Sequence, residues 1–456
     1  MTNNCDNSTL VRISRKAFIQ VILLLAAFLA ASIILTWIIP SGSISVIKGV
    51  CAPVLVFFSG DGPALIMLCL FLIILTAAFQ TLSDAGGIGV LIGSVADRFK
   101  DRGVLLIAST SFVFMCFGAF LGLFEEMLVM LPVMAMLFLT AGYDSFTGFL
   151  VCIVSCGFGF ASAITNPFTV LLASEIIGAN PTDNIWYRLV IFVAMYLLLL
   201  CFILIYVGRL KKDPSSSLTA KHDARLREAS GRMTGCAPTE RAGRKSGLIT
   251  GIFLAVSLAV ILVCSMSDTL RSYVVVVLSA YFLIFGFITG ILCTGSVKKT
   301  AKSFLKGLVS GLPTICFIAM ASSIKYVFEE GGAMPAVAGL IEDIAGHNSP
   351  ALVAVVLYAI ILVLEFFISS STAKAILVMG LLSMTDLGLT KQMSVLIYTF
   401  ADGYTNVLFP TSPVLLIALS MIEVDYLKWV KKSSVLFIIN LLMVLGFLLL
   451  GIVIGY

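Results

Sequence analysis

Gly122-Leu-Phe-Glu-Glu-Met-Leu-Val-Met-Leu-Pro132 is the stretch that decides the fold, because it places two adjacent carboxylates inside an apolar run. The run covers residues 103–140, about twice the ~20 residues that one straight membrane crossing requires. An acid at the bilayer centre costs about 3 kcal/mol, so such residues face protein or a water-filled cavity. The stretch therefore predicts a re-entrant hairpin, 103–140, that turns near Glu125 and Glu126 and forms half of a substrate site.

Composition places the whole chain in the membrane. Of 456 residues, 60% are hydrophobic and 12% are charged, which is typical of an all-α polytopic membrane protein and excludes a soluble domain. The net charge of +5 comes from loops between apolar segments, so it gives no reason to expect nucleic acid. The cysteines are scattered without a Cys-x-x-Cys pair, and His222 and His347 fall in predicted loops. We expect no metal and no cofactor.

Outward from the first hairpin, the sequence predicts about nine transmembrane helices, two re-entrant hairpins and two discontinuous helices. The second hairpin covers 351–383 and the broken helices cover 145–177 and 394–421. Thr165-Asn166-Pro167 interrupts the first broken helix, because proline lacks a backbone donor and asparagine favours turns. The polar segment 210–246 predicts a flexible cytoplasmic linker. Basic loops place the N-terminus in the cytoplasm and the C-terminus outside.

An internal repeat links the two halves. Asp84-Ala-Gly-Gly and Glu329-Glu-Gly-Gly are related by an offset that also carries Glu125 and Glu126 onto Ser370 and Ser371, and Asn166 and Pro167 onto Thr411 and Ser412. Opposite orientation of the copies predicts an inverted repeat, which is typical of secondary transporters. The expected domains are scaffold 1–102, transport domain 103–209, linker 210–246, scaffold 247–345 and transport domain 346–456.

The candidate site lies at the two hairpin tips and the two helix breaks. The expected substrate-binding residues are Glu125, Glu126, Thr165, Asn166, Pro167, Thr169, Ser369, Ser370, Ser371, Thr372, Asp402, Thr405, Asn406, Thr411 and Ser412. Of these, Glu126, Asn166 and Asp402 are also candidates for a coupling ion, Na+ or H+. The structural alternatives are a helix cap for the glutamates, a packing kink at Asn166 and close helix packing at the serines.

Several motifs resemble a known family. They are Glu125-Glu126 followed by Pro132, Ala141-Gly-Tyr-Asp144, Asn166-Pro167-Phe168, Ser369-Ser370, Phe400-Ala-Asp402-Gly403-Tyr404-Thr405-Asn406 and Pro410-Thr-Ser412. Together they resemble the YfcC-like branch of the C4-dicarboxylate anaerobic carrier (DcuC) family, in the ion transporter superfamily. The resemblance implies a basic amino-acid antiporter that works by an elevator-like movement, with the scaffold forming a homodimer.

The expected function is a secondary active transporter in the cell inner membrane, where the lipid bilayer and a small-molecule substrate are its partners. If Glu125, Glu126, Asp402 and Lys374 share one cavity, its formal charge is near −2, which favours protons or cations. Basic amino acids such as arginine and ornithine therefore rank first, and Na+- or H+-coupled C4-dicarboxylates second. An intramembrane enzyme is the alternative from another class, disfavoured because no nucleophile-and-base pair stands out. Glu365 and Glu175 are interpreted as structural, and Lys374 as either an acid's partner or a substrate ligand.

Overall fold

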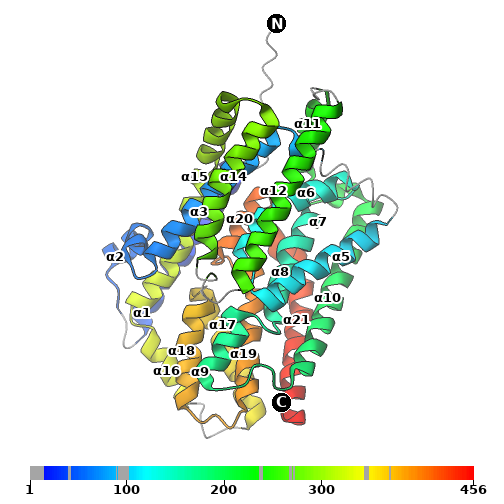
Figure 1. The fold of residues 1–456 in the computed structure, drawn as a ribbon. Helices are drawn as coiled ribbons and strands as arrows, with labels where there is room; N and C mark the ends of the chain where they lie inside the picture. The colour runs from blue at the N-terminus through cyan, green and yellow to red at the C-terminus, as the bar shows by residue number, and fades with distance from the viewer. Residues whose placement is uncertain are drawn as a thin grey trace.

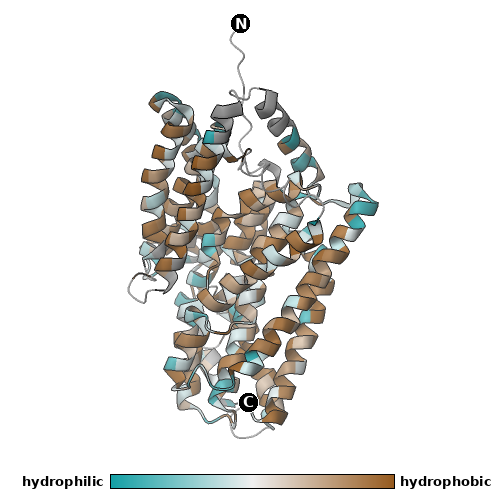
Figure 2. Ribbon diagram, turned by 45° about the vertical axis from the view of Figure 1, so that its right-hand side comes forward, coloured by the Kyte–Doolittle hydropathy of each residue, from teal (hydrophilic) through white to brown (hydrophobic). Residues whose placement is uncertain are grey.

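The computed structural model describes residues 15–39, 43–88, 90, 102–235, 240–266, 270, 273–343, 349–368 and 371–456. Over these residues the secondary structure is entirely helical (Figure 1). Eight of the described helices are long and apolar enough to cross a membrane. Hydrophobic residues cover the middle of these helices, and hydrophilic residues gather at their ends (Figure 2). The predicted class, an all-α polytopic membrane protein, is confirmed.

One bundle consists of α1 (Arg15–Ile38), α2 (Val46–Leu55), α3 (Gly62–Asp84), α12 (Glu240–Met266), α14 (Val274–Thr294) and α15 (Val297–Glu330). Most of its helices lie on the left in Figure 1. Close approach of α15 to α3 depends on Gly307, since a Cβ there would lie 2.4 Å from the Cα of Ala77. The bundle contains most of the predicted scaffold segments and joins elements from both halves of the chain.

The chain interrupts its helix at the predicted first tip. Helix α5 (Gly103–Cys116) continues through a wider π-helical turn and ends at Gly122, whose φ of 67° is left-handed. A side chain is strained in that conformation, so glycine suits the position. A short 3-10 turn carries Glu125 and Glu126, and α6 (Leu131–Thr140) follows. The boundaries agree with those expected for the 103–140 hairpin.

The first broken helix has two parts. Helices α7 (Ser145–Phe149) and α8 (Ser155–Ala161) are joined by a π-helical turn, and α8 ends before Asn166. Pro167 then opens a further π-helical turn that leads into α9 (Leu172–Ile177). Proline suits this first position because its missing N–H has no helical partner there. The continuous helix α10 (Ile185–Lys212) follows.

The second half repeats this organisation of helix, break and helix. Helix α16 (Met334–Asp343) precedes α17 (Pro350–Phe367) and α18 (Ser371–Met384), which occupy the predicted second hairpin. Helix α19 (Lys391–Gly403), a 3-10 turn and α20 (Pro413–Met421) occupy the second broken helix. Helix α21 (Tyr426–Ile454) is the last. The predicted broken helix 394–421 is therefore interrupted between Gly403 and Pro413.

The linker prediction was wrong in one respect. The segment expected to be flexible contains α11 (Ala220–Gly235), so His222 lies in a helix and not in a loop. Asp223 anchors this helix, because its carboxylate accepts hydrogen bonds from the backbone N–H of Ser145 (3.3 Å) and from the hydroxyl of Thr219 (2.7 Å). The contact with Ser145 joins residues 78 positions apart in the chain, which local composition does not reveal. His347, Ser369 and Ser370 lie outside the described residues.

Candidate substrate site

The first tip carries the two glutamates that the sequence singled out. Glu126 is 7% exposed, and one of its carboxylate oxygens accepts the backbone N–H of Phe124 at 3.2 Å. Glu125 is partly buried. Over the described part of the chain, neither carboxylate has a basic side chain within ion-pair distance. The tip therefore presents carboxylate oxygens that a proton or a cation can bind.

Asn166 connects the first break to the first tip. Its side-chain oxygen accepts the backbone N–H of Phe168 at 2.9 Å, and its amide nitrogen donates to the Gly118 carbonyl at 3.0 Å. The N–H groups of Ile164 and Thr165 both donate to the carbonyl of Ala119. Unwinding a helix in an apolar environment leaves such groups unpaired unless a neighbour supplies partners. Here the π-helical turn that follows α5 supplies them.

Two glycines allow the hairpin and the broken helix to approach this closely. A Cβ on Gly118 would lie 2.1 Å from the carbonyl oxygen of Cys156, and one on Gly159 would lie 2.1 Å from that of Met115. Gly403 makes the corresponding contact between the two broken helices, since its Cβ would lie 2.0 Å from the Cα of Ala161. Tight backbone contact thus joins the first hairpin, the first broken helix and the second broken helix.

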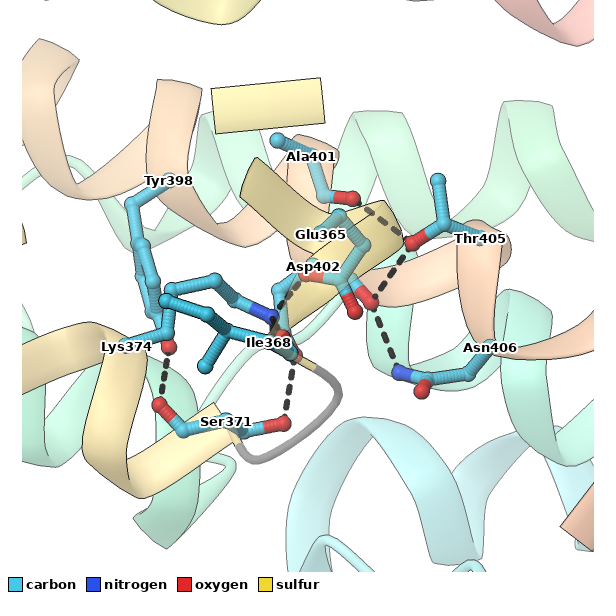
Figure 3. A network of polar contacts seen from close by, with 9 residues as sticks. All are labelled: Glu365, Ile368, Ser371, Lys374, Tyr398, Ala401, Asp402, Thr405 and Asn406. Carbon is cyan, nitrogen blue, oxygen red and sulfur yellow. Dashed lines mark hydrogen bonds and ion pairs between the residues drawn. The ribbon is translucent and has the colours of Figure 1, made fainter. Parts of the chain in front are cut away.

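The second tip contains a buried ionic cluster (Figure 3). Lys374 on α18 forms ion pairs with Glu365 on α17 and with Asp402 on α19, the latter at 2.8 Å. Its ammonium also donates to the carbonyl of Ile368 at 3.1 Å. Lys374 and Asp402 are fully buried, and Glu365 is 2% exposed. Two carboxylates and one ammonium leave the cluster with a formal charge of −1.

Neighbouring polar groups hold Asp402 in place. The hydroxyl of Ser371 donates to its other carboxylate oxygen at 2.8 Å. The side-chain amide of Asn406 donates to the backbone carbonyl of Asp402 at 2.7 Å, and the hydroxyl of Thr405 donates to the carbonyl of Ala401 at 2.8 Å (Figure 3). At the end of α19, the side chains of Thr405 and Asn406 therefore bind the last backbone carbonyls of the helix.

Two hydroxyls at the breaks lack partners. The side-chain oxygens of Thr169 and Thr411 are buried, and neither has a hydrogen-bond partner among the described residues. Ser412 caps α20 instead, because its hydroxyl accepts the N–H of Leu415 at 3.4 Å. A buried hydroxyl without a partner costs about 1–3 kcal/mol. A polar ligand at the breaks would relieve that cost.

Only some of the expected residues come together. Ser371, Asp402, Thr405 and Asn406 form one network, and Thr165, Asn166 and Pro167 lie beside the first tip. The side chain of Thr372 is exposed. In the described structure no hydrogen bond or ion pair connects Glu125 or Glu126 with Lys374 or Asp402.

Two charged residues beside the candidate site were not among the binding residues expected from the sequence. Glu365 was interpreted as structural, although an acid in an apolar run followed nine residues later by Lys374 was an available signal. Arg188 is 3% exposed and donates to the carbonyl of Ala163 in the first break at 3.1 Å. No carboxylate in the described residues pairs with it.

Comparison with known proteins identifies the family. Residues 63–453 match the family model described as the C4-dicarboxylate anaerobic carrier, DcuC. The chain belongs to this family. It is therefore an integral membrane transporter, as expected.

Individual relatives of this carrier differ in what is known of them. This chain is 28% identical over 399 residues to YfcC of Escherichia coli (strain K12), which is provisionally named a basic amino acid antiporter. The match covers 84% of this chain and 77% of YfcC. The chain is 21% identical over 382 residues to an uncharacterized protein of Haemophilus influenzae (strain ATCC 51907 / DSM 11121 / KW20 / Rd), covering 83% and 74% of the two chains. The Alcanivorax borkumensis YdaH transporter is 16% identical, with a TM-score of 0.44 over 96% of this chain and 99% of that one.

Proposed function

We propose that this carrier exchanges amino acids across the cell inner membrane and prefers basic ones such as arginine and ornithine. The excess of buried carboxylate at the two tips carries this proposal. The second tip has a formal charge of −1, and ionised Glu125 and Glu126 add to it without a described basic partner. Uncompensated charge is costly away from water. A substrate with a cationic side chain compensates the charge directly.

The rest of an amino acid also finds chemistry at the breaks. The unpartnered hydroxyls of Thr169 and Thr411 can bind a polar head group. Helix N-termini open at Pro167 and Pro413, and such ends favour a carboxylate. The provisional name of the relative YfcC, a basic amino acid antiporter, agrees with this substrate class. The coupling ion, Na+ or H+, would bind at Glu126, Asn166 or Asp402.

The test is counterflow in proteoliposomes with arginine, ornithine and succinate. Glu126→Gln removes the buried charge, and Glu175→Gln is its matched control because Glu175 is exposed on the same half of the chain. We expect the first variant to lose arginine exchange by about tenfold or more, since a charged hydrogen bond contributes about 1.5–3 kcal/mol. The control should exchange like wild type. Succinate as the sole wild-type substrate, or unchanged arginine exchange by Glu126→Gln, would contradict the proposal.

A second candidate is cation-coupled transport of a C4-dicarboxylate. The family's description names that substrate class. Arg188 also favours it, because this buried guanidinium lies at the first break without a described carboxylate partner. The succinate arm of the same counterflow experiment separates the two candidates.

We also propose that the hairpins and broken helices move together against the scaffold in an elevator-like manner, in a homodimer with a cytoplasmic N-terminus. Phe328 of α15 stacks on Phe367 beside the second tip, with ring centroids 4.4 Å apart, so this contact must separate during such movement. Cysteines at these two positions should cross-link and stop exchange reversibly. Full exchange by the cross-linked protein would contradict the movement.

A further inference from the structure

The ammonium of Lys374 lies in a cage of oxygen atoms at the second tip (Figure 3). An ammonium has three donors. Three oxygen groups surround it here: the Glu365 carboxylate and the Ile368 carbonyl (3.1 Å) accept its hydrogen bonds, and Asp402 Oδ1 forms an ion pair with it at 2.8 Å without a hydrogen bond. The ammonium is therefore surrounded by oxygen atoms of the protein itself, two of them carboxylate oxygens.

These oxygens are of the type that hard metal cations bind. Carboxylates and backbone carbonyls are the usual ligands of such cations in proteins. In transporters with broken helices, Na+ is held by unwound carbonyls and by the C-terminal ends of half-helices. Ile368 follows the last residue of α17 and has an extended backbone, φ −115° and ψ 91°. The Lys374 ammonium thus occupies a position whose chemistry suits a coupling cation.

We propose that Lys374 is a built-in countercation that replaces a coupling metal ion at the second tip, so that transport requires no Na+. The inference rests on the proposed transport function and specifies its coupling. It also removes Asp402 from the candidate Na+ ligands and leaves the first tip as the place for a proton.

The physical reason is the burial of two acids. Glu365 and Asp402 lie too deep for water to screen them, and two buried carboxylates without a cation strongly repel each other. A free ion must be bound again in every transport cycle. A cation tethered through the chain is present at high effective concentration whatever the ion composition outside.

The first measurement needs only the wild-type protein. Exchange of its own substrate, arginine or succinate, is measured in proteoliposomes with Na+ or choline as the sole added cation. We expect equal rates within experimental error. A wild-type rate that depends on Na+ overturns the inference, whichever substrate is carried. This outcome can be distinguished from an error in the proposed substrate, because the comparison uses whichever substrate the protein exchanges.

The second measurement replaces the tethered cation by a free one. Lys374→Ala removes the ammonium and its chain, which leaves room for an ion. Exchange in choline should fall by about tenfold or more, because removing one partner leaves the buried charges uncompensated. Added Na+, methylammonium or n-propylammonium should restore a large part of the rate. Lys298→Ala, at an exposed position, should behave like wild type in every medium.

A folding control accompanies these variants. If Lys374→Ala elutes as aggregate, the Glu365→Gln, Lys374→Ala double variant removes one acid with the ammonium and keeps the formal charge at −1. Rescue by Na+ or by amines is expected there too. Loss of exchange that no cation restores in a folded variant, or wild-type exchange by Lys374→Ala in choline, overturns the inference. If neither variant folds, the wild-type comparison decides.

Discussion

The contact between the two broken helices predicts a large effect of one methyl group at Gly403. A Cβ at this position would lie 2.0 Å from the Cα and 2.1 Å from the backbone nitrogen of Ala161. Carbon atoms pack best at about 3.5–4.0 Å, so the approach is too short by about 1.5 Å. The obstructing atoms belong to backbone, and no rotamer change can move them. We expect Gly403→Ala to cost about 1–3 kcal/mol, as overpacking does in other cores.

Gly380 provides the matched control. It also lies in a helix of the second half, α18, and a Cβ there would meet nothing within 4 Å. Alanine should stabilise that helix by about 1 kcal/mol. Thermal unfolding of both variants in one detergent, followed by size-exclusion chromatography, should give a lower Tm for Gly403→Ala and an equal or higher Tm for Gly380→Ala. A Gly403→Ala protein that melts at or above wild type would refute the close approach of α19 to α8.

Three further predictions test other contacts. Asn166→Ala should destabilise the protein by about 1–3 kcal/mol in a thermal melt, because it leaves the Gly118 carbonyl and the Phe168 N–H unpaired, whereas exposed Asn180→Ala should not. Burial alone would raise the pKa of Glu423, but His222 and Arg225 lower it overall, so its contribution to α11 docking is present above pH 4.5 and is lost as the pH falls through the lowered value. The protection of α11 amides, taken relative to the intrinsic exchange rate at each pH, should therefore fall in acid. Glu423→Gln should lose under about 1 kcal/mol of this protection at neutral pH and should show no such fall in acid; identical protection profiles for the variant and the wild type would refute the prediction. Cysteines replacing Lys221 and Asp343, both exposed, should react with impermeant reagents from opposite sides of the membrane, and labelling from one side would exclude the inverted repeat.

The sequence predicts well the features whose causes are local. Gly122 and Pro167 favour a helix break through their own backbone chemistry, and Glu125 and Glu126 mark the first break because an acid is costly in an apolar run. The helix boundaries at Thr140 and Ile177 agree with those expected. Length and apolar composition were enough for the all-helical membrane class. The division into scaffold and transport domains and the inverted topology remain predictions.

Contacts between distant segments could not be predicted from the sequence. Helix α11 is too polar to predict as a packed element, and its anchoring depends on Asp223 meeting the start of α7. Arg188 lies at the start of a long apolar helix, where a basic residue usually faces the membrane surface, yet it turns inward to the Ala163 carbonyl. Both cases required a partner that only the folded chain brings near.

The two tips differ in how their buried carboxylates are compensated. In the predicted repeat, Ser370 and Ser371 stand where the first half has Glu125 and Glu126, so the second tip has no acids at those positions. Glu365 and Asp402 supply acids from the flanking helices instead, and Lys374 compensates one of their two charges within the cluster. The first tip has no such cation among the described residues. Its carboxylates therefore have the larger need for an incoming positive charge, and a cationic substrate or a proton should bind there first.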